Sequence, residues 1–511
     1  MPAGGHRPIG ADFAWPHARP PFLTNPAPRY YRLALFFAVA FTVAHVIALP
    51  VGMTYDGGQY ATLATVFGRQ FPAGWDFARN PLYPLALRVF FWGLGRHASA
   101  AVLLNSLFGF VGVWSLGAAL RRLGSARLAA ACLVVLTVYP TLITYEHMVL
   151  TEAGSFFFLA LLANALTWQP ARSGWKTSAI TMVAIAGFHF RATLLAMAPL
   201  AAILLGLELV SRHRRSTPAP RWRATLRAVA PHVAIAALAP ILAAIPWNVA
   251  VARSPHHNYN GQNLLYGLVK QAVLPPSDPL VSGVKDTYKA AIADASAGGH
   301  LDVGGLRRAT HLPVFTAIEP RSDEASAIFR KSVRRYPGRY LAGVGRGLLL
   351  YAGVHSIDSE TETYVHGVIG EARTGSKLWF GEPWNTPEFV AAFSQPGRNT
   401  ALAKLVELLV TPFTTMVSIG ALVTLAGFAI GCWRHDLGLL TFTGLPLWWM
   451  IVHALTLMSS DRLVAPAHAF LVLNAPVLPF YVAKHRARLF GVSPRLKVNA
   501  TTAVAGDAPT R

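Results

Sequence analysis

Ten long apolar runs, separated by short polar stretches, limit the folds open to this chain more than any other feature. A helix needs about 20 apolar residues to cross a bilayer core, and most of the runs approach that length. Only 13% of the 511 residues are charged and 53% are hydrophobic, whereas a soluble domain carries about 25% charged residues. The sequence therefore predicts an all-α polytopic membrane protein with about ten transmembrane helices. The predicted spans are 33–51, 100–118, 128–145, 150–168, 178–190, 192–210, 228–250, 402–431, 437–457 and 463–482.

Arginine and lysine in the short loops predict the orientation of these spans. Basic loops remain in the cytoplasm, and the basic short loops here are 121–127, 172–176, 212–227 and the turn at Arg434. Both termini are then cytoplasmic, and the loops at 52–99 and about 251–401 are extracytoplasmic. We expect a multi-pass protein of the cytoplasmic (inner) membrane with its active site on the extracytoplasmic face.

Five segments follow from this topology. The first outer loop contains two apolar helical patterns, 59–68 and 80–95, which are typical of interfacial helices. The predicted segments are a cytoplasmic tail (1–32), an N-terminal transmembrane catalytic module (33–250), a long extracytoplasmic loop or small domain (251–401), C-terminal transmembrane helices (402–482) and a basic cytoplasmic tail (483–511).

The net charge of +22 is explained by the basic cytoplasmic segments, which also attract anionic lipid. A nucleic-acid partner is not expected, because no basic patch marks a soluble domain. No nucleotide-binding or strong metal-binding motif is present. The two cysteines, Cys132 and Cys432, fall in or at predicted spans, so no disulfide framework is expected in the long outer loop.

Carboxylates occur at two places near the predicted outer surface. Asp56 follows the first span in Thr54–Tyr60, where a charge is costly unless it has a function, although Asp-Gly-Gly is also turn chemistry. Glu152 opens the fourth span, either as a functional acid or as a helix-start carboxylate favoured by the helix dipole, with Thr151 as the cap. Glu146 is expected at the solvated rim, with substrate contact as the alternative.

Three arginines lie at the same predicted surface: Arg191, Arg253 and Arg462. A single arginine at a helix end usually extends its charge to water. Arginines together with acids also suit one reaction type, in which a carboxylate takes a proton and cations hold an anionic leaving group.

Seven segments, in order along most of the chain, resemble the GT-C superfamily of integral-membrane glycosyltransferases, nearest the protein O-mannosyltransferase and lipid A aminoarabinose-transferase branch. Two departures stand out: Gly57 follows Asp56 where many relatives have a second acid, and no proline follows Arg191. The segments that carry the resemblance are Asp56–Tyr60, Asn80–Leu85, Met148–Glu152, His189–Arg191, Pro246–Arg253, Arg334–Leu341 and Asp461–Pro466.

The resemblance implies an inverting, mannosyltransferase-like transfer of a hexosyl or pentosyl group from a polyprenyl-phosphate-linked sugar to an acceptor hydroxyl. The acceptor is a glycan, a lipid or a protein of the cell envelope, and no nucleotide is needed. The resemblance implies that Asp56 and Glu152 are the catalytic carboxylates, with Asp56 as the general base. It implies that Glu152 is also a ligand of a divalent cation, Mg²⁺ or Mn²⁺. The implied donor-phosphate ligands are Arg191, Arg253 and Arg462, and the implied substrate contacts are Tyr60, Tyr83 and Glu146.

Two other classes remain alternatives. A membrane transporter or lipid flippase would carry ionisable residues deep in the bundle and broken helices in matching halves. A non-catalytic envelope-assembly subunit would keep the fold and tolerate loss of Asp56.

The predicted topology can be tested by cysteine labelling. A cysteine introduced at Gly298, in the long predicted outer loop, should react with an impermeant thiol reagent on cells whose inner membrane is intact, because this loop is expected outside. Labelling that requires lysis of the inner membrane would reverse the orientation.

Overall fold

The structure is a computed structural model. It describes residues 28–52, 55–66, 79–95, 98–170, 172–216, 222–253, 322–353, 359–362, 364–366, 400–457 and 461–490, with a few positions between 261 and 279. Within these ranges the chain is helical, and the one β-type contact is an isolated bridge between Gly52 and Met148. The all-α architecture is confirmed. The predicted terminal tails, 1–32 and 483–511, lie mostly outside the described residues.

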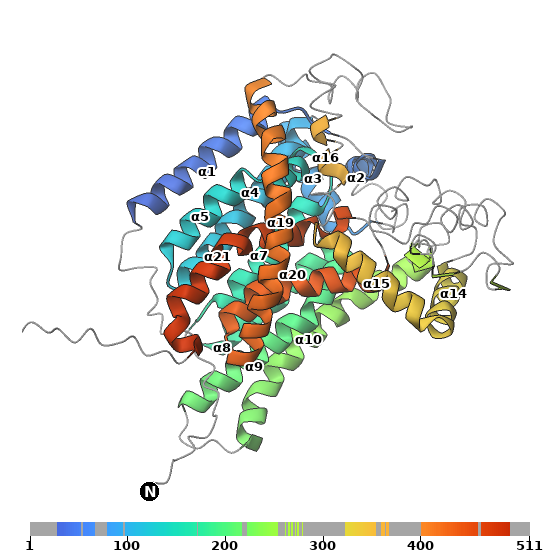
Figure 1. Ribbon diagram of the computed structural model, residues 1–511. Helices are drawn as coiled ribbons and strands as arrows, with labels where there is room; N and C mark the ends of the chain where they lie inside the picture. Colours follow the sequence, from blue (N-terminus) through green and yellow to red (C-terminus); the bar gives the residue numbers. More distant parts are fainter. Residues whose placement is uncertain are drawn as a thin grey trace, which may run out of the picture.

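Every predicted span falls on helical structure in one elongated bundle (Figure 1). Tight turns connect several neighbours, so consecutive helices run back and forth. The bundle helices are α1 (Arg29–Ala48), α4 (Ala98–Arg122), α5 (Ala126–Thr137), α6 (Pro140–His147), α7 (Glu152–Thr167), α8 (Ser173–Phe190), the 3₁₀ helix η1 (Ala192–Ala196), α9 (Met197–Ser216), α10 (Trp222–Arg253), α19 (Thr400–Arg434), α20 (Leu437–Leu455) and α21 (Ala465–Phe490).

Fewer than ten of these helices have the length and apolarity of a membrane span. Among the described residues seven meet both conditions, and an eighth results if the bent pair α5 and α6 counts as one span. The chain is thus a multi-pass membrane protein, but the predicted count of ten is not confirmed. The difference lies in α7, which has 16 residues, and α8, which includes Lys176 and His189.

The shorter helices gather at one end of the bundle and beside it. The two patterns predicted in the first outer loop correspond to α2 (Tyr55–Val66) and α3 (Leu82–Leu94). Both lie with α16 (Ser359–Glu362) at the upper end of Figure 1. The remaining short helices are α14 (Ser322–Arg335), α15 (Pro337–Tyr351) and the 3₁₀ helix η6 (Asp461–Val464).

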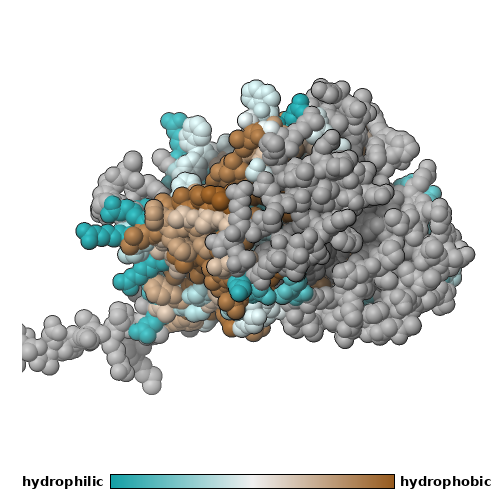
Figure 2. Space-filling model, turned by 90° about the horizontal axis from the view of Figure 1, so that it is seen from above, coloured by the Kyte–Doolittle hydropathy of each residue, from teal (hydrophilic) through white to brown (hydrophobic). Residues whose placement is uncertain are grey.

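Burial divides the helices into an inner and an outer set. Helix α7 is buried along nearly its whole length and packs against α4, α8 and α21. Helices α1 and α10 are mostly exposed and turn large apolar side chains such as Phe36 and Leu242 outward, as lipid-facing helices do. From the end that carries α2 and α3, Figure 2 shows a broad apolar area where described residues form the surface.

The third predicted span is broken. Helix α5 ends at Thr137, and Pro140 is at the start of α6, where its missing N–H costs no hydrogen bond. The two helices meet at a bend of 55°. The bend directs α6 and the turn after it, residues 148–151, toward the start of α7.

A buried ion cluster lies near the start of α8. Lys176, which the loop charges placed in a cytoplasmic loop, is fully buried in the first turn of α8 and pairs with Glu208 of α9. Glu208 also accepts from Arg212 at 2.7 Å. The three side chains satisfy one another, as a charge inside an apolar bundle requires.

Gly420 permits a close crossing of α19 and α21. A Cβ atom there would lie 1.9 Å from the carbonyl oxygen of Leu471 on α21. We expect Gly420→Ala to destabilise the protein by about 1–3 kcal/mol through overpacking, measured as a lower thermal unfolding midpoint in detergent. Gly345→Ala on α15 is the matched control, because a Cβ there meets nothing within 4 Å. Equal midpoints for the two variants would contradict the crossing.

Candidate active site

The candidate active site lies at the end of the bundle where α2, η6 and the start of α7 come together (Figure 1). Two acids and three arginines from five separate segments meet there. They form an unbroken series of alternating charge in the order Arg79, Asp56, Arg462, Glu152 and Arg191. Three guanidinium groups and two carboxylates leave one positive charge among these five side chains.

Arg462 is at the middle of this series. Its Nη2 donates to Asp56 Oδ2 at 2.6 Å, and its Nε lies 3.3 Å from Glu152 Oε1. Asp56 belongs to α2 and Arg462 to η6, which follows α20 near the end of the chain. The guanidinium can serve both carboxylates because its donors are spread over a planar fork.

Arg79 is the site residue that the sequence reasoning missed. It pairs with Asp56, donates to Gln59 Oε1 from Nε at 3.0 Å, and its guanidinium lies 5.1 Å from the centre of the Tyr60 ring. The next residue, Asn80, donates to the Phe188 carbonyl of α8. The available signal was its position directly before Asn80–Leu85, a segment already singled out.

Glu152 is placed by the start of α7. It is the first residue of that helix, where the dipole favours a negative charge, and it is 2% exposed. Thr151 precedes the helix but makes no side-chain capping hydrogen bond. Glu152 Oε1 accepts from Arg191 Nη1 at 3.1 Å, so Glu152 is both a helix-start carboxylate and a member of the charge series.

Arg191 reaches Glu152 because the chain is extended between α8 and η1. Its backbone has φ −152° and ψ 124°. The preceding Phe190 packs directly on Gly154 of α7, where a Cβ would lie 2.0 Å from the ring. The absence of a side chain at Gly154 thus allows α8 to approach within reach of Glu152.

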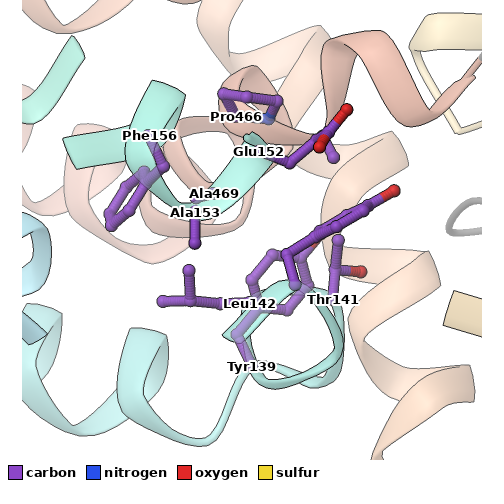
Figure 3. A pocket seen from close by; sticks show the side chains of 10 residues that line it. Tyr139, Thr141, Leu142, Glu152, Ala153, Phe156, Pro466 and Ala469 are labelled. Atoms are coloured by element: carbon purple, nitrogen blue, oxygen red, sulfur yellow. The ribbon is translucent and has the colours of Figure 1, made fainter. Parts of the chain in front are cut away.

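A small cleft adjoins Glu152. Its cavity volume is about 10 Å³, room for about one water molecule, whereas a pocket for a whole small molecule has roughly 300–1,000 Å³. Figure 3 shows the Glu152 carboxylate at one side and Leu142, Ala153 and Phe156 along the apolar wall. Pro466 and Ala469 of α21 complete the wall, so α6, α7 and α21 all contribute. In this structure the cleft is therefore too small for a sugar, and its lining is mostly apolar.

The two arginines determine the ionisation of Asp56. Burial alone would raise the pKa of this carboxyl group, but the charges and hydrogen bonds of Arg462 and Arg79 outweigh it and hold the pKa well below its usual value of 3.8. Asp56 is therefore ionised at any physiological pH.

Four of the predicted residues converge and one does not. Asp56, Glu152, Arg191 and Arg462 are brought together. Glu146, expected at a solvated rim, is 4% exposed and contacts His45 of α1 instead. Its prediction as an exposed rim residue is wrong, because α6 turns it into the bundle.

The predicted substrate contacts Tyr60 and Tyr83 lie beside Arg79, whereas the predicted phosphate ligand Arg253 lies at the end of α10. Tyr60 contacts Arg79, and Tyr83 packs edge-on against Tyr60 with ring centres 5.0 Å apart. Tyr83 is fully buried and donates to Asn105, so it supports Tyr60 from behind. Arg253 is the last residue of α10, and its side chain lies outside the described residues.

The described residues do not by themselves provide the predicted cation site. Glu152 Oε1 faces two arginines, and no group of three His, Cys, Asp or Glu side chains suited to a metal occurs in the described part of the chain. Glu152 Oε2 is buried without a hydrogen-bond partner there, which leaves one carboxylate oxygen as a ligand. A divalent cation on Glu152 stays a prediction, which turnover with and without a chelator decides.

Comparison with known proteins gives two solved structures. No protein-family model and no curated protein sequence matches the chain. ArnT from Cupriavidus metallidurans bound to undecaprenyl phosphate is similar over 89% of this chain and 79% of its own, with 14% identity and a TM-score of 0.30. The apo form of the same ArnT gives 16% identity, a TM-score of 0.31 and the same coverage. Because both TM-scores are low, we infer function from this chain's own residues.

The depressed pKa of Asp56 predicts how the site responds to acid. Because the folded-state pKa is below the ordinary value, the ion pairs stabilise the fold fully above about pH 4 and lose their effect as pH falls toward the folded-state pKa. The difference in thermal midpoint between wild type and Asp56→Asn should stay constant from about pH 7 to pH 5 and shrink only below about pH 4. A change between pH 7 and pH 5 would show that the arginines do not hold Asp56.

Proposed function

We propose that this chain is an inverting glycosyltransferase of the GT-C type, which transfers a sugar from a polyprenyl-phosphate-linked donor to an acceptor hydroxyl at the outer face of the cytoplasmic membrane. The observation that carries the proposal is the charge series from Arg79 to Arg191 at one end of an apolar helix bundle. It combines acids, cations and a lipid-facing surface, which are the groups this reaction needs. The resembling sequence segments contribute Asp56, Glu152, Arg191 and Arg462 to it.

Asp56 is the proposed general base. One carboxylate oxygen accepts the proton of the acceptor hydroxyl while that oxygen attacks the anomeric carbon from the side opposite the leaving group. The bond between the anomeric carbon and the phosphate oxygen breaks, and the configuration inverts. The carboxylate is ionised at rest, so it is ready to accept a hydrogen bond from the hydroxyl.

The arginines are the proposed ligands of the departing polyprenyl phosphate. Arg462 and Arg191 both reach Glu152, and their side chains are about one-fifth and one-eighth exposed (20% and 13%), so a phosphate can reach them. A phosphate that binds Arg462 competes with Asp56 for the guanidinium. Loss of that partner raises the pKa of Asp56, so donor binding makes the base stronger when it is needed. Arg253 stays a proposed further ligand.

The lipid part of the donor would lie along the bundle. The cleft beside Glu152 is apolar along α21 and α6, and Pro466 in its wall follows Arg462 by one helical turn. An isoprene unit next to the phosphate would match the apolar lining of this cleft, which would have to widen to admit it. No nucleotide takes part, because the lipid phosphate bond supplies the driving force.

Sugar and acceptor identity do not follow from these residues. Tyr60 is proposed as a sugar contact through its position at Arg79, and the acceptor is a glycan, lipid or protein of the envelope. The mannosyl preference and the hexosyl or pentosyl class stay proposals. Comparison of lipid-linked sugars and envelope glycans in cells with and without the protein identifies both.

Asp56→Asn is the direct test of function. The variant should fold and insert but retain at most about one percent of transfer, because a general base contributes about 10²–10⁴-fold. Transfer is measured with a labelled polyprenyl-phosphate sugar in membranes that contain the protein. Asp323→Asn on α14, an exposed acid, is the matched control and should keep full activity. Normal turnover in Asp56→Asn contradicts the assigned base, and full biological function without any transfer favours an assembly subunit.

A further inference from the structure

Glu146 and His147 belong to a buried network that the proposed reaction does not use. Glu146 Oε2 lies 3.1 Å from His45 Nε2, and His45 Nδ1 lies 3.0 Å from His147 Nε2. His147 Nδ1 lies 3.1 Å from the carbonyl oxygen of Pro50. All three side chains are at most 4% exposed. The network joins α1 and α6 and ends on the chain that leaves α1.

The Pro50 carbonyl determines the direction of the two hydrogen bonds of His147, whereas the contact between Glu146 and His45 is an ion-pair distance without hydrogen-bond geometry. A carbonyl oxygen only accepts, so His147 Nδ1 must carry the proton that it donates. If His147 is neutral, its Nε2 accepts from His45 Nδ1. The last contact then needs one proton between His45 Nε2 and Glu146, either on the carboxyl group or on the imidazole. In both forms the network has no net charge, which is the state with the lowest free-energy cost of burial for these three side chains.

The residues that the network holds, 50–52, are here called the strap. The strap connects α1 to the start of α2, and Asp56 lies four residues after it. Pro50 O accepts a second hydrogen bond from Tyr364 OH at 2.7 Å. Gly52 N donates to the His147 carbonyl at 2.9 Å, and Gly52 pairs with Met148 in the isolated bridge. The strap is thus fixed to the end of α6 on both sides of Val51.

A second series of contacts reaches the same turn from the other side of the site. Tyr83, behind Tyr60, donates to Asn105 Oδ1 at 3.1 Å. Asn105 Nδ2 donates to the Met148 carbonyl at 2.7 Å. The His147–Met148 peptide is therefore connected to both flanks of Asp56, and Glu152 follows it by four residues.

We propose that the buried Glu146–His45–His147 network is a net-neutral positioning device, which holds the strap and through it sets Asp56 relative to Glu152. The proposal rests on the proposed function for its catalytic consequence only. It gives Glu146 a role different from the substrate contact expected from its position beside Glu152. In this role Glu146 acts through His45 and touches no substrate.

Strap mobility can be measured without any transfer assay. Ala61 on α2 is 1% exposed, so a cysteine there should react slowly with a thiol reagent when α2 is held. The exposed native Cys432, far along the chain on α19, is the internal control. Mass spectrometry of the two peptides gives both rates in one sample of the full-length protein.

The labelling rates of three variants distinguish the effect of this network from a general effect of packing. His45→Leu in the Ala61→Cys protein should raise labelling at position 61 about 2- to 12-fold, which corresponds to about 0.5–1.5 kcal/mol for one hydrogen bond, with Cys432 labelling unchanged. Glu146→Gln should label like the parent, because its neutral amide beside neutral His45 keeps the set uncharged and leaves the two hydrogen bonds of His147 in place. Tyr364→Phe removes only the second bond to Pro50 and should also raise the rate, which keeps the test decisive if His45→Leu does not fold.

Equal labelling of the parent, His45→Leu and Tyr364→Phe overturns the proposal, and so does fast labelling of Glu146→Gln. In the transfer assay His45→Leu should lower kcat with the donor KM unchanged, because the base and not the phosphate site is displaced. If labelling changes as expected while the wild type shows no transfer, the positioning device stands and the proposed function fails.

Discussion

The candidate site depends on the contacts of Arg462, because among the described residues this side chain alone contacts both Asp56 and Glu152. It lies 406 positions after Asp56 and comes from the short helix before α21. The site therefore is not contained in the N-terminal module predicted at 33–250. Without the C-terminal helices, Asp56 and Glu152 would face each other with no cation between them. The N-terminal and C-terminal helices must pack together before Asp56 and Glu152 can contact Arg462.

Two ion clusters among the described residues differ in burial, and this difference indicates which of them can accept a new partner. Lys176, Glu208 and Arg212 satisfy one another, and the first two are almost completely buried, so an exchange of partners there would leave a charge unpaired at high cost. Asp56, Arg79 and Arg462 are each about one-fifth exposed and can accept a new partner with water nearby. Only the second cluster has the accessibility that a substrate requires.

The sequence predicted which charged residues come together better than it predicted how they are arranged. Asp56, Glu152, Arg191 and Arg462 were singled out because charge at the ends of apolar runs is costly, and that reasoning depends on composition alone. Arg79 lies in a loop, where an arginine costs nothing, so its charge did not single it out and its place beside Asn80–Leu85 was the one signal in the sequence. Glu146 was expected at the solvated rim, but the helix break at residues 148–151 turns it into the bundle and turns Glu152 toward the arginines. The span count of ten is not confirmed, in part because α7 has 16 residues; this helix is enclosed by other helices and need not itself be long enough for lipid.

The pairing of Asp56 with two arginines also accounts for how such a site would avoid a side reaction. A carboxylate that could activate a hydroxyl could equally activate water and hydrolyse the donor. With Arg79 and Arg462 in place the pKa of Asp56 is depressed, and a weak base activates water poorly. In the proposed reaction a phosphate bound to Arg462 would pair with one of the two charges that lower the pKa of Asp56, so the base would strengthen only when the donor is bound. The strap then keeps the carboxylate in place while its partner changes, because its hydrogen bonds run to Pro50 and Gly52 and involve neither arginine.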